Sequence, residues 1–266
     1  MRMVGFGRGL LAIALASVAI LSLSYGDFVP RGQPFPSWIP WRQAWIYGSA
    51  LILLSASAGL CFTRTALPSL LTICAYQMVW AVICALPVFS APLGIGTWYG
   101  VCEALTPLVA AWILYAMLRR QSHGPQLPIA SERAVRAAQV VLGLTWVFYG
   151  WSHFVYADYT ASMVPTWLPG RLGLAYFTGL GHIAAGIGMI VGVLPRLAAT
   201  LEAIMMSLFG LLVWVPSFFA QPKPDWATSP QNQWSELVVN VMLAAGAWMV
   251  AISLSNRSWG FNRSSR

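Results

Sequence analysis

The sequence has few charged residues and none of the common soluble-enzyme motifs. Only 8% of its 266 residues are charged, whereas 58% are hydrophobic. Soluble domains carry about 25% charged and about 45–50% apolar residues, so this composition is typical of a membrane protein. No dinucleotide-binding loop, phosphate-binding loop or nucleophile elbow occurs, which leaves no motif for nucleotide chemistry or serine hydrolysis.

Cysteine is also scarce. The four cysteines are Cys61, Cys74, Cys84 and Cys102, and none of them forms a Cys-x-x-Cys pair. This spacing argues against a thioredoxin-like redox pair and a zinc knuckle, and we expect no metal site. Cys84 and Cys102 fall toward the same end of adjacent predicted helices, where either a disulfide or simple apolar packing would fit.

The apolar residues lie in uncharged stretches that are long enough to cross a membrane. A helix needs about 20 apolar residues to span the ~30 Å hydrocarbon core. Dividing the stretches at proline and glycine gives eight predicted helices, over residues 8–26, 43–62, 66–87, 97–118, 136–155, 172–193, 197–219 and 235–255. We therefore predict an all-α membrane protein with eight transmembrane helices, surrounded by the lipid bilayer.

A Trp-hydrophobe-Pro motif occurs twice, as Trp38–Pro40 and, 129 residues later, as Trp167–Pro169. Each copy is followed by an arginine, Arg42 in the first and Arg171 in the second. A fixed spacing over several landmarks indicates an internal duplication. Because each copy contains four predicted helices, the two four-helix units should have the same orientation, as in a parallel duplication. The first apolar stretch then has an internal equivalent, so we expect a helix there rather than a cleaved signal peptide.

The basic residues predict the orientation of the chain. Most arginines fall on the side shared by the N terminus and the even-numbered loops, while the other side holds Arg31, Arg42, Arg171 and Lys223. The positive-inside rule then places both termini in the cytoplasm, and the net charge of +8 gives no reason to expect nucleic-acid binding. We predict a first repeat over residues 1–118, a basic cytoplasmic linker over 119–135, a second repeat over 136–255 and a basic cytoplasmic tail over 256–266.

Two histidines lie within predicted helices of the second repeat. His182 shares a helical face with Arg171 and Thr178, because these residues are separated by 7 and 4 positions. His153 lies near the outer end of the preceding helix, and the first repeat has Leu53 where the second has His182. Ionisable groups at membrane depth are costly and indicate function, although a neutral histidine can equally be a structural hydrogen-bonding residue.

These residues predict a ligand site in the outer half of the second repeat. Its members are His153, His182, Trp167, Arg171, Tyr176 and Thr178. The histidines would hydrogen-bond a ligand and exchange protons with it, and Trp167 and Tyr176 would supply aromatic walls. We expect His182 to point into the bundle, with His153 opening onto the same cavity. Haem ligation is a weaker alternative, since the two histidines are expected at different depths.

Acidic residues gather toward the predicted outer side. A charged rim around an outward-opening site would consist of Asp27, Arg42, Glu103, Asp158 and Glu236. The alternative is interfacial capping, in which the acids offset helix dipoles and the arginine reaches lipid headgroups. Glu202, which could pair with Arg196 or Arg64 or reach the interface, receives no functional role.

Four segments of the second repeat resemble the DoxX-like family of small bacterial membrane proteins, which have four helices per unit. The segments are Trp146–His153, Pro165–Pro169, Tyr176–Gly186 and Leu194–Ala199. Gly179 and His182 match the Gly-x-x-(Glu or His) pattern on the second helix of that family. The resemblance covers roughly residues 140–220, and the first repeat is similar only through Trp38, Pro40, Arg42 and their spacing.

Characterised members of that family include a small subunit of a thiosulfate:quinone oxidoreductase, and relatives assist periplasmic redox maturation. The resemblance implies a bacterial inner-membrane protein that interacts with quinone from the outer half of the membrane, as a redox-linked subunit with a periplasmic or membrane redox partner. A non-catalytic scaffold or assembly factor for a partner enzyme is the alternative, followed by a small-solute transporter. The sequence leaves open whether the protein is itself an enzyme.

Overall fold

The computed structural model describes residues 2–30, 33–36, 38–122 and 127–259, and these ranges contain helices but no strand. Arg31, residues 123–126 of the predicted linker and residues 260–266 of the predicted tail lie outside the described residues. Within them, seven helices are long and apolar enough to cross a membrane, and a bent helix pair makes an eighth if it is one span. The prediction of an all-helical chain is therefore confirmed for the described residues, with seven or eight helices that could span a membrane.

The helices follow the predicted spans closely. The first half contains α1 (Arg2–Tyr25), α2 (Arg42–Leu60), α3 (Ala66–Ser90) and α4 (Ile95–Gln121). The second half contains η1 (Pro128–Ala130), α5 (Glu132–Val155), α6 (Ala157–Met163), α7 (Arg171–Val191), α8 (Pro195–Phe209), η2 (Gly210–Trp214), α9 (Val215–Ser217) and α10 (Pro230–Ser253). The segment η2 is a π-helical turn, so α8, η2 and α9 together form one span over Pro195–Ser217.

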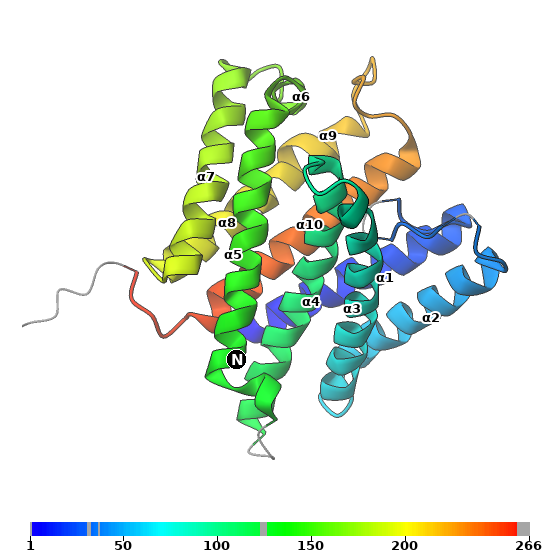
Figure 1. Ribbon diagram of the computed structural model, residues 1–266, viewed down its shortest axis with the longest axis vertical. Helices are drawn as coiled ribbons and strands as arrows, with labels where there is room; N and C mark the ends of the chain where they lie inside the picture. The colour runs from blue at the N-terminus through cyan, green and yellow to red at the C-terminus, as the bar shows by residue number, and fades with distance from the viewer. Residues whose placement is uncertain (1, 31–32, 37, 123–126, 260–266) are drawn as a thin grey trace, which may run out of the picture.

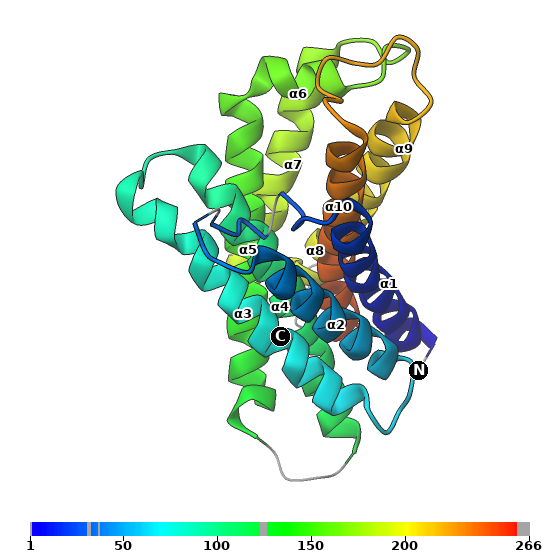
Figure 2. The same ribbon diagram turned by 90° about the vertical axis from the view of Figure 1, so that its right-hand side faces the viewer.

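The helices α4 and α10 form the centre of the molecule (Figure 1). α4 packs against α3, α5 and α10, while α10 also packs against α1 and α8. α1 lies beside both α2 and α10 (Figure 2). The outer helices expose apolar side chains such as Ile13, Leu51 and Phe177. An apolar exterior of this kind is expected for helices that face lipid.

The helices α5 and α7 approach each other through glycines. A Cβ atom at Gly150 would lie 2.5 Å from the carbonyl oxygen of Gly179, and one at Gly186 would lie 2.5 Å from the carbonyl oxygen of Gly143. Small residues allow helix backbones to pack this closely in membranes. The same contact presses His153 onto α7, since a Cβ atom at Gly179 would lie 2.8 Å from the Cβ of His153.

Local backbone features fix the ends of the helices around this pair. After Val155 the chain bends by 95° into α6, which therefore crosses the end of α5. Gly192 closes α7 with a left-handed φ of 78° and donates its N–H to the carbonyl of Gly188, a conformation that glycine adopts without strain. At the start of α10, the Ser229 side chain accepts from the N–H of Asn232. No disulfide joins the four cysteines, all of which lie among the described residues.

Candidate functional site

A cavity of about 1900 Å³ lies among α4, α5, α7, α8 and α10. Most of its wall is apolar, and residues from both halves contribute, from Pro30 in the loop before α2 to Leu243 in α10. Drug-sized ligand pockets are about 300–1,000 Å³, so this cavity can hold a larger, mainly apolar molecule. A small number of polar side chains interrupts the apolar wall, and these are the candidate functional residues.

A buried imidazole–carboxyl pair joins α7 to α8 beside this cavity. Nδ1 of His182 lies 2.7 Å from Oε1 of Glu202, and the two side chains are 1% and 0% exposed. The prediction that His182 points into the bundle is therefore confirmed. At this distance one hydrogen bond joins the imidazole nitrogen to the carboxyl oxygen.

His153 lies next to the pair. Its Nδ1 is 3.0 Å from Oγ1 of Thr178 and 3.2 Å from the carbonyl oxygen of Ala175. The rings of His153 and His182 are 5.1 Å apart between centroids and nearly perpendicular, and both line the cavity. The expected difference in depth is small because the glycine contacts set the end of α5 beside the second turn of α7. Rings this close leave no room for a haem between them.

A break in the regular helix places an aromatic ring over the two imidazoles. The ring of Phe209 stacks on His153 at 6.2 Å and lies 5.9 Å from His182. The π-helical turn begins at the next residue, Gly210, where a Cβ atom would lie 2.8 Å from Oδ1 of Asn240 on α10. Single π-helical turns inside α-helices are frequent at functional sites. The turn thus positions both Phe209 and Asn240 in the cavity wall.

Three predicted members of the site lie away from the cavity. Trp167 is 70% exposed in the loop before α7, and Tyr176 stacks on Phe154 with ring centroids 5.4 Å apart. Tyr176 is six residues from His182, about 240° around a helix, so it lies on a different face. Arg171 is exposed as the first residue of α7. Trp167 and Tyr176 are therefore not among the residues that line this cavity.

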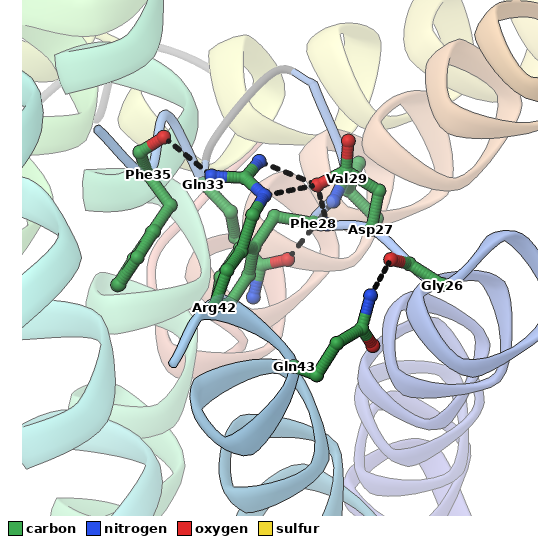
Figure 3. Close-up of polar contacts among 8 residues, drawn as sticks. All are labelled: Gly26, Asp27, Phe28, Val29, Gln33, Phe35, Arg42 and Gln43. Carbon is green, nitrogen blue, oxygen red and sulfur yellow. Dashed lines mark hydrogen bonds and ion pairs between the residues drawn. The ribbon is translucent and has the colours of Figure 1, made fainter. Parts of the chain in front are cut away.

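The predicted charged rim does not form one surface. Arg42 instead binds Asp27 with its Nε and Nη2 atoms, the Nε contact being 3.1 Å (Figure 3). Arg42 also donates to the carbonyl of Phe35 and lies over the rings of Phe28 and Phe35. Asp158 is exposed on α6, apart from this contact. Arg42 and Asp27 therefore fasten the loop before α2 to the start of that helix.

The other two acids of the predicted rim lie in the cavity wall. Glu103 on α4 is only 4% exposed, and Glu236 on α10 is partly buried. The helices begin at Ile95 and Pro230, earlier than predicted, so neither acid lies in the first turn where it would offset the helix dipole. Both carboxyl groups are instead polar members of the cavity.

Sequence reasoning missed Glu202, which is the hydrogen-bond partner of His182. Arg196, considered as its partner, donates to the carbonyl of Arg257 and lies 4.0 Å from the ring of Trp259. Arg196 and Glu202 are six residues apart, so they point to different sides of α8. A useful indication was available, namely a single acid inside an apolar helix that directly follows the helix with His182.

Comparison with known protein families gives a match in the second half of the chain. A family model described as a domain of unknown function (DUF8561) matches residues 142–251. No curated protein matches the chain, and no solved structure does. The matched segment contains His153, His182 and Glu202, so the part of the chain that is similar to this family carries the buried pair.

Proposed function

We propose that this protein is a DoxX-like integral membrane protein that binds a quinone in its cavity and serves as a redox-linked subunit. The observation that carries the proposal is the His182–Glu202 pair, with His153 beside it, in the wall of a large apolar cavity. A membrane quinone has the matching chemistry, with a polar ring head and a long apolar tail. Apolar pockets with a few convergent polar groups are the usual form of such ligand sites.

In this proposal the polar residues of the cavity transfer protons, and they do not carry electrons. A quinone takes up two electrons and two protons when it becomes a quinol, and loses them on oxidation. His153 and the His182–Glu202 pair are the groups that exchange the protons. The electrons pass to or from a redox partner protein in the periplasm or membrane. This chain is therefore the quinone-binding subunit of a larger electron-transfer assembly.

The internal duplication belongs to the same proposal. α1 packs against α2 and α10, while α5 packs against α7 and α4. In each half, the first helix thus packs against the second helix of its own half and against the last helix of the other half. This reciprocal packing supports two parallel four-helix units related by an axis along the membrane normal. Arg42 and Arg171, which begin α2 and α7, support the same correspondence.

We place the protein in the bacterial inner membrane with both termini in the cytoplasm, on the distribution of arginines. Reporter fusions after Arg133 and at the C-terminal Arg266 test this orientation. Both should behave as cytoplasmic, whereas a fusion in the loop between α9 and α10 should behave as periplasmic. A periplasmic signal at Arg133 would refute the assigned orientation.

A scaffold or assembly role is the competing function. It would use the exposed helices to hold a partner and would need no ligand in the cavity. Transport of a small anion is less well supported, because no arginine or lysine occurs among the described residues that line the cavity. A cavity for anions would need cations or convergent hydrogen-bond donors.

Lipid extraction of the purified protein tests the proposal against the scaffold. The protein should be solubilised in mild detergent, purified and extracted, and the quinone content measured by chromatography with ultraviolet detection. We expect about one quinone per chain, far above the quinone that co-purifies with an unrelated membrane protein from the same membranes. A stable protein partner with background quinone would refute the proposal in favour of the scaffold.

A further inference from the structure

The hydrogen-bonding direction of His153 is fixed by its surroundings. The carbonyl oxygen of Ala175 can only accept, so Nδ1 of His153 must carry the hydrogen. The hydroxyl of Thr178 is itself within donating distance of the carbonyl of Leu174, which leaves its oxygen free to accept from Nδ1. In the neutral ring, Nε2 therefore has no hydrogen and acts as an acceptor. No described residue hydrogen-bonds this atom.

Glu202 adds a second acceptor. One hydrogen bond joins Nδ1 of His182 to Oε1 of Glu202, and with no further proton on the carboxyl group Oε2 can only accept. Oε2 is buried and has no hydrogen-bond partner in the described part of the chain. Buried polar atoms are nearly always paired, and an unpaired one is destabilising. Because Glu202 borders the cavity, a donor on a bound ligand is the partner that this oxygen lacks.

The rest of the polar lining is mixed. Among the described residues, the wall has the carboxyl groups of Glu103 and Glu236 and also hydroxyl and amide groups that can donate, such as those of Tyr149 and Asn240, but no arginine or lysine. The choice between the redox forms therefore rests on Nε2 of His153 and Oε2 of Glu202. The two redox forms of a quinone differ in the hydrogen bonds that they can make. The ring oxygens of the quinone only accept, whereas the hydroxyls of the quinol donate. A quinone carbonyl facing these acceptors would gain no hydrogen bond from them, whereas a quinol hydroxyl would.

We propose that the cavity binds the reduced, quinol form of its ligand in preference to the quinone, with His153 Nε2 and Glu202 Oε2 accepting from the hydroxyls. This inference rests on the proposed function, because it assumes a quinone-type ligand in the cavity. It adds the direction of the redox reaction, which the proposed function leaves open. The subunit retains quinol and releases quinone, as a site for quinol oxidation would.

The test compares the affinities of the two redox forms. Protein in lipid nanodiscs would be titrated with decylubiquinone, and separately with its quinol kept reduced under argon, with empty nanodiscs as the partition control. One to two hydrogen bonds to buried acceptors are at stake, so we expect the quinol to bind about tenfold more tightly. Equal affinities, or tighter binding of the quinone, would overturn this inference and leave the proposed function standing. No saturable binding of either form would overturn both.

Two variants sharpen the result. E202Q replaces an acceptor oxygen by an amide that also donates, so the preference for quinol should fall to below about threefold. Y76F removes a hydroxyl in the first half that is not part of the cavity wall, and it should keep the wild-type ratio. If E202Q folds and keeps the full preference, the assignment of Oε2 is wrong. The wild-type ratio decides the main question even if E202Q does not fold.

Discussion

The two halves of the chain each have four long helices, yet positions 129 residues apart in the sequence carry different chemistry. At the spacing of 129 residues, Leu53 stands where the second half has His182, and Ile73 stands where it has Glu202. Leu53 is 1% exposed and Ile73 is 0% exposed, and both belong to one apolar cluster. A pair of aliphatic side chains thus occupies in one half the kind of place that an ionisable pair occupies in the other.

Hydrogen bonds between helices show the same contrast. Ser49 of α2, equivalent to Thr178, bonds the hydroxyl of Tyr76 on α3 at 2.6 Å, and Tyr76 also accepts from Gln33. Thr178 of α7 instead faces His153 on α5. Neutral groups therefore make these hydrogen bonds between helices in the first half, whereas titratable groups make them beside the cavity in the second half. The first half packs Leu53 and Ile73 at the matching sequence positions without an ionisable pair, which favours a role for the pair of the second half beyond packing.

The largest expected effect comes from breaking the buried pair on one side. His182→Leu leaves a buried carboxyl group without its partner, and removing one member of a buried pair costs about 3–5 kcal/mol. The double change H182L/E202I copies the aliphatic residues of the first half, and such replacements are often neutral or stabilising. Thermal unfolding in detergent should therefore show a large loss for the single variant and near-wild-type stability for the double.

The same measurement tests whether the two halves are packed alike at these positions. If the single variant were as stable as the wild type, the pair would not be the buried contact described here. If the double variant were as unstable as the single, the apolar filling of the first half would not transfer. The halves would then be less alike than their shared spacing indicates.

The glycine contact between α5 and α7 gives the next largest effect. Gly179→Ala puts a Cβ atom 2.8 Å from the Cβ of His153, and overpacking of this kind costs about 1–3 kcal/mol. The first half already has Ala50 at the equivalent position, so the tight contact belongs to the second half. Gly173→Ala on the same helix meets no atom within 4 Å and is the control. An unfolding temperature for Gly179→Ala equal to that control would contradict the contact.

A smaller effect is expected from the neutral network of the first half. Tyr76→Phe removes the contacts to Ser49 and Gln33 and should destabilise the protein by about 0.5–1.5 kcal/mol. Chemical denaturation measures this loss, and ligand content should stay at the wild-type level. A loss of bound ligand in this variant would mean that the first half contributes to the site.

The smallest effect is expected at the loop before α2. The side chains of Arg42 and Asp27 are 33% and 47% exposed, so water screens their attraction. Asp27→Asn should therefore lower stability by less than about 1 kcal/mol, and less again in high salt. Unfolding measured at low and high ionic strength tests this prediction, and a large salt-independent loss would contradict it.

The helices were predictable because the residues within each helix determine where it begins and ends. Uncharged apolar stretches fixed most boundaries to within a few residues, as for α2, predicted over 43–62 and found at Arg42–Leu60. The bend after Val155 and the π-helical turn at Gly210 were missed. Both depend on contacts with neighbouring helices, such as that of Gly210 with Asn240, which no pattern within one helix records.

The site was predictable only in part. The cost of burying an ionisable group indicated that His182 points inward, and the structure agrees. Its partner Glu202 was missed because sequence spacing favoured a basic partner and could not relate α7 to α8 in space. Trp167, predicted from a repeated motif, is exposed and does not line the cavity, because such a motif can mark a turn without marking a binding wall.

The central claim is that the ligand site belongs to the second half and depends on His182 and Glu202. The most direct measurement is the amount of quinone that co-purifies with two matched double variants, H182L/E202I in the second half and S49A/Y76F in the first. We predict that H182L/E202I folds and that its bound quinone falls to about one tenth of the wild-type amount or less, as the loss of one or two buried hydrogen bonds implies. S49A/Y76F should keep the wild-type amount. Wild-type quinone in folded H182L/E202I, or its loss from S49A/Y76F alone, would contradict the account.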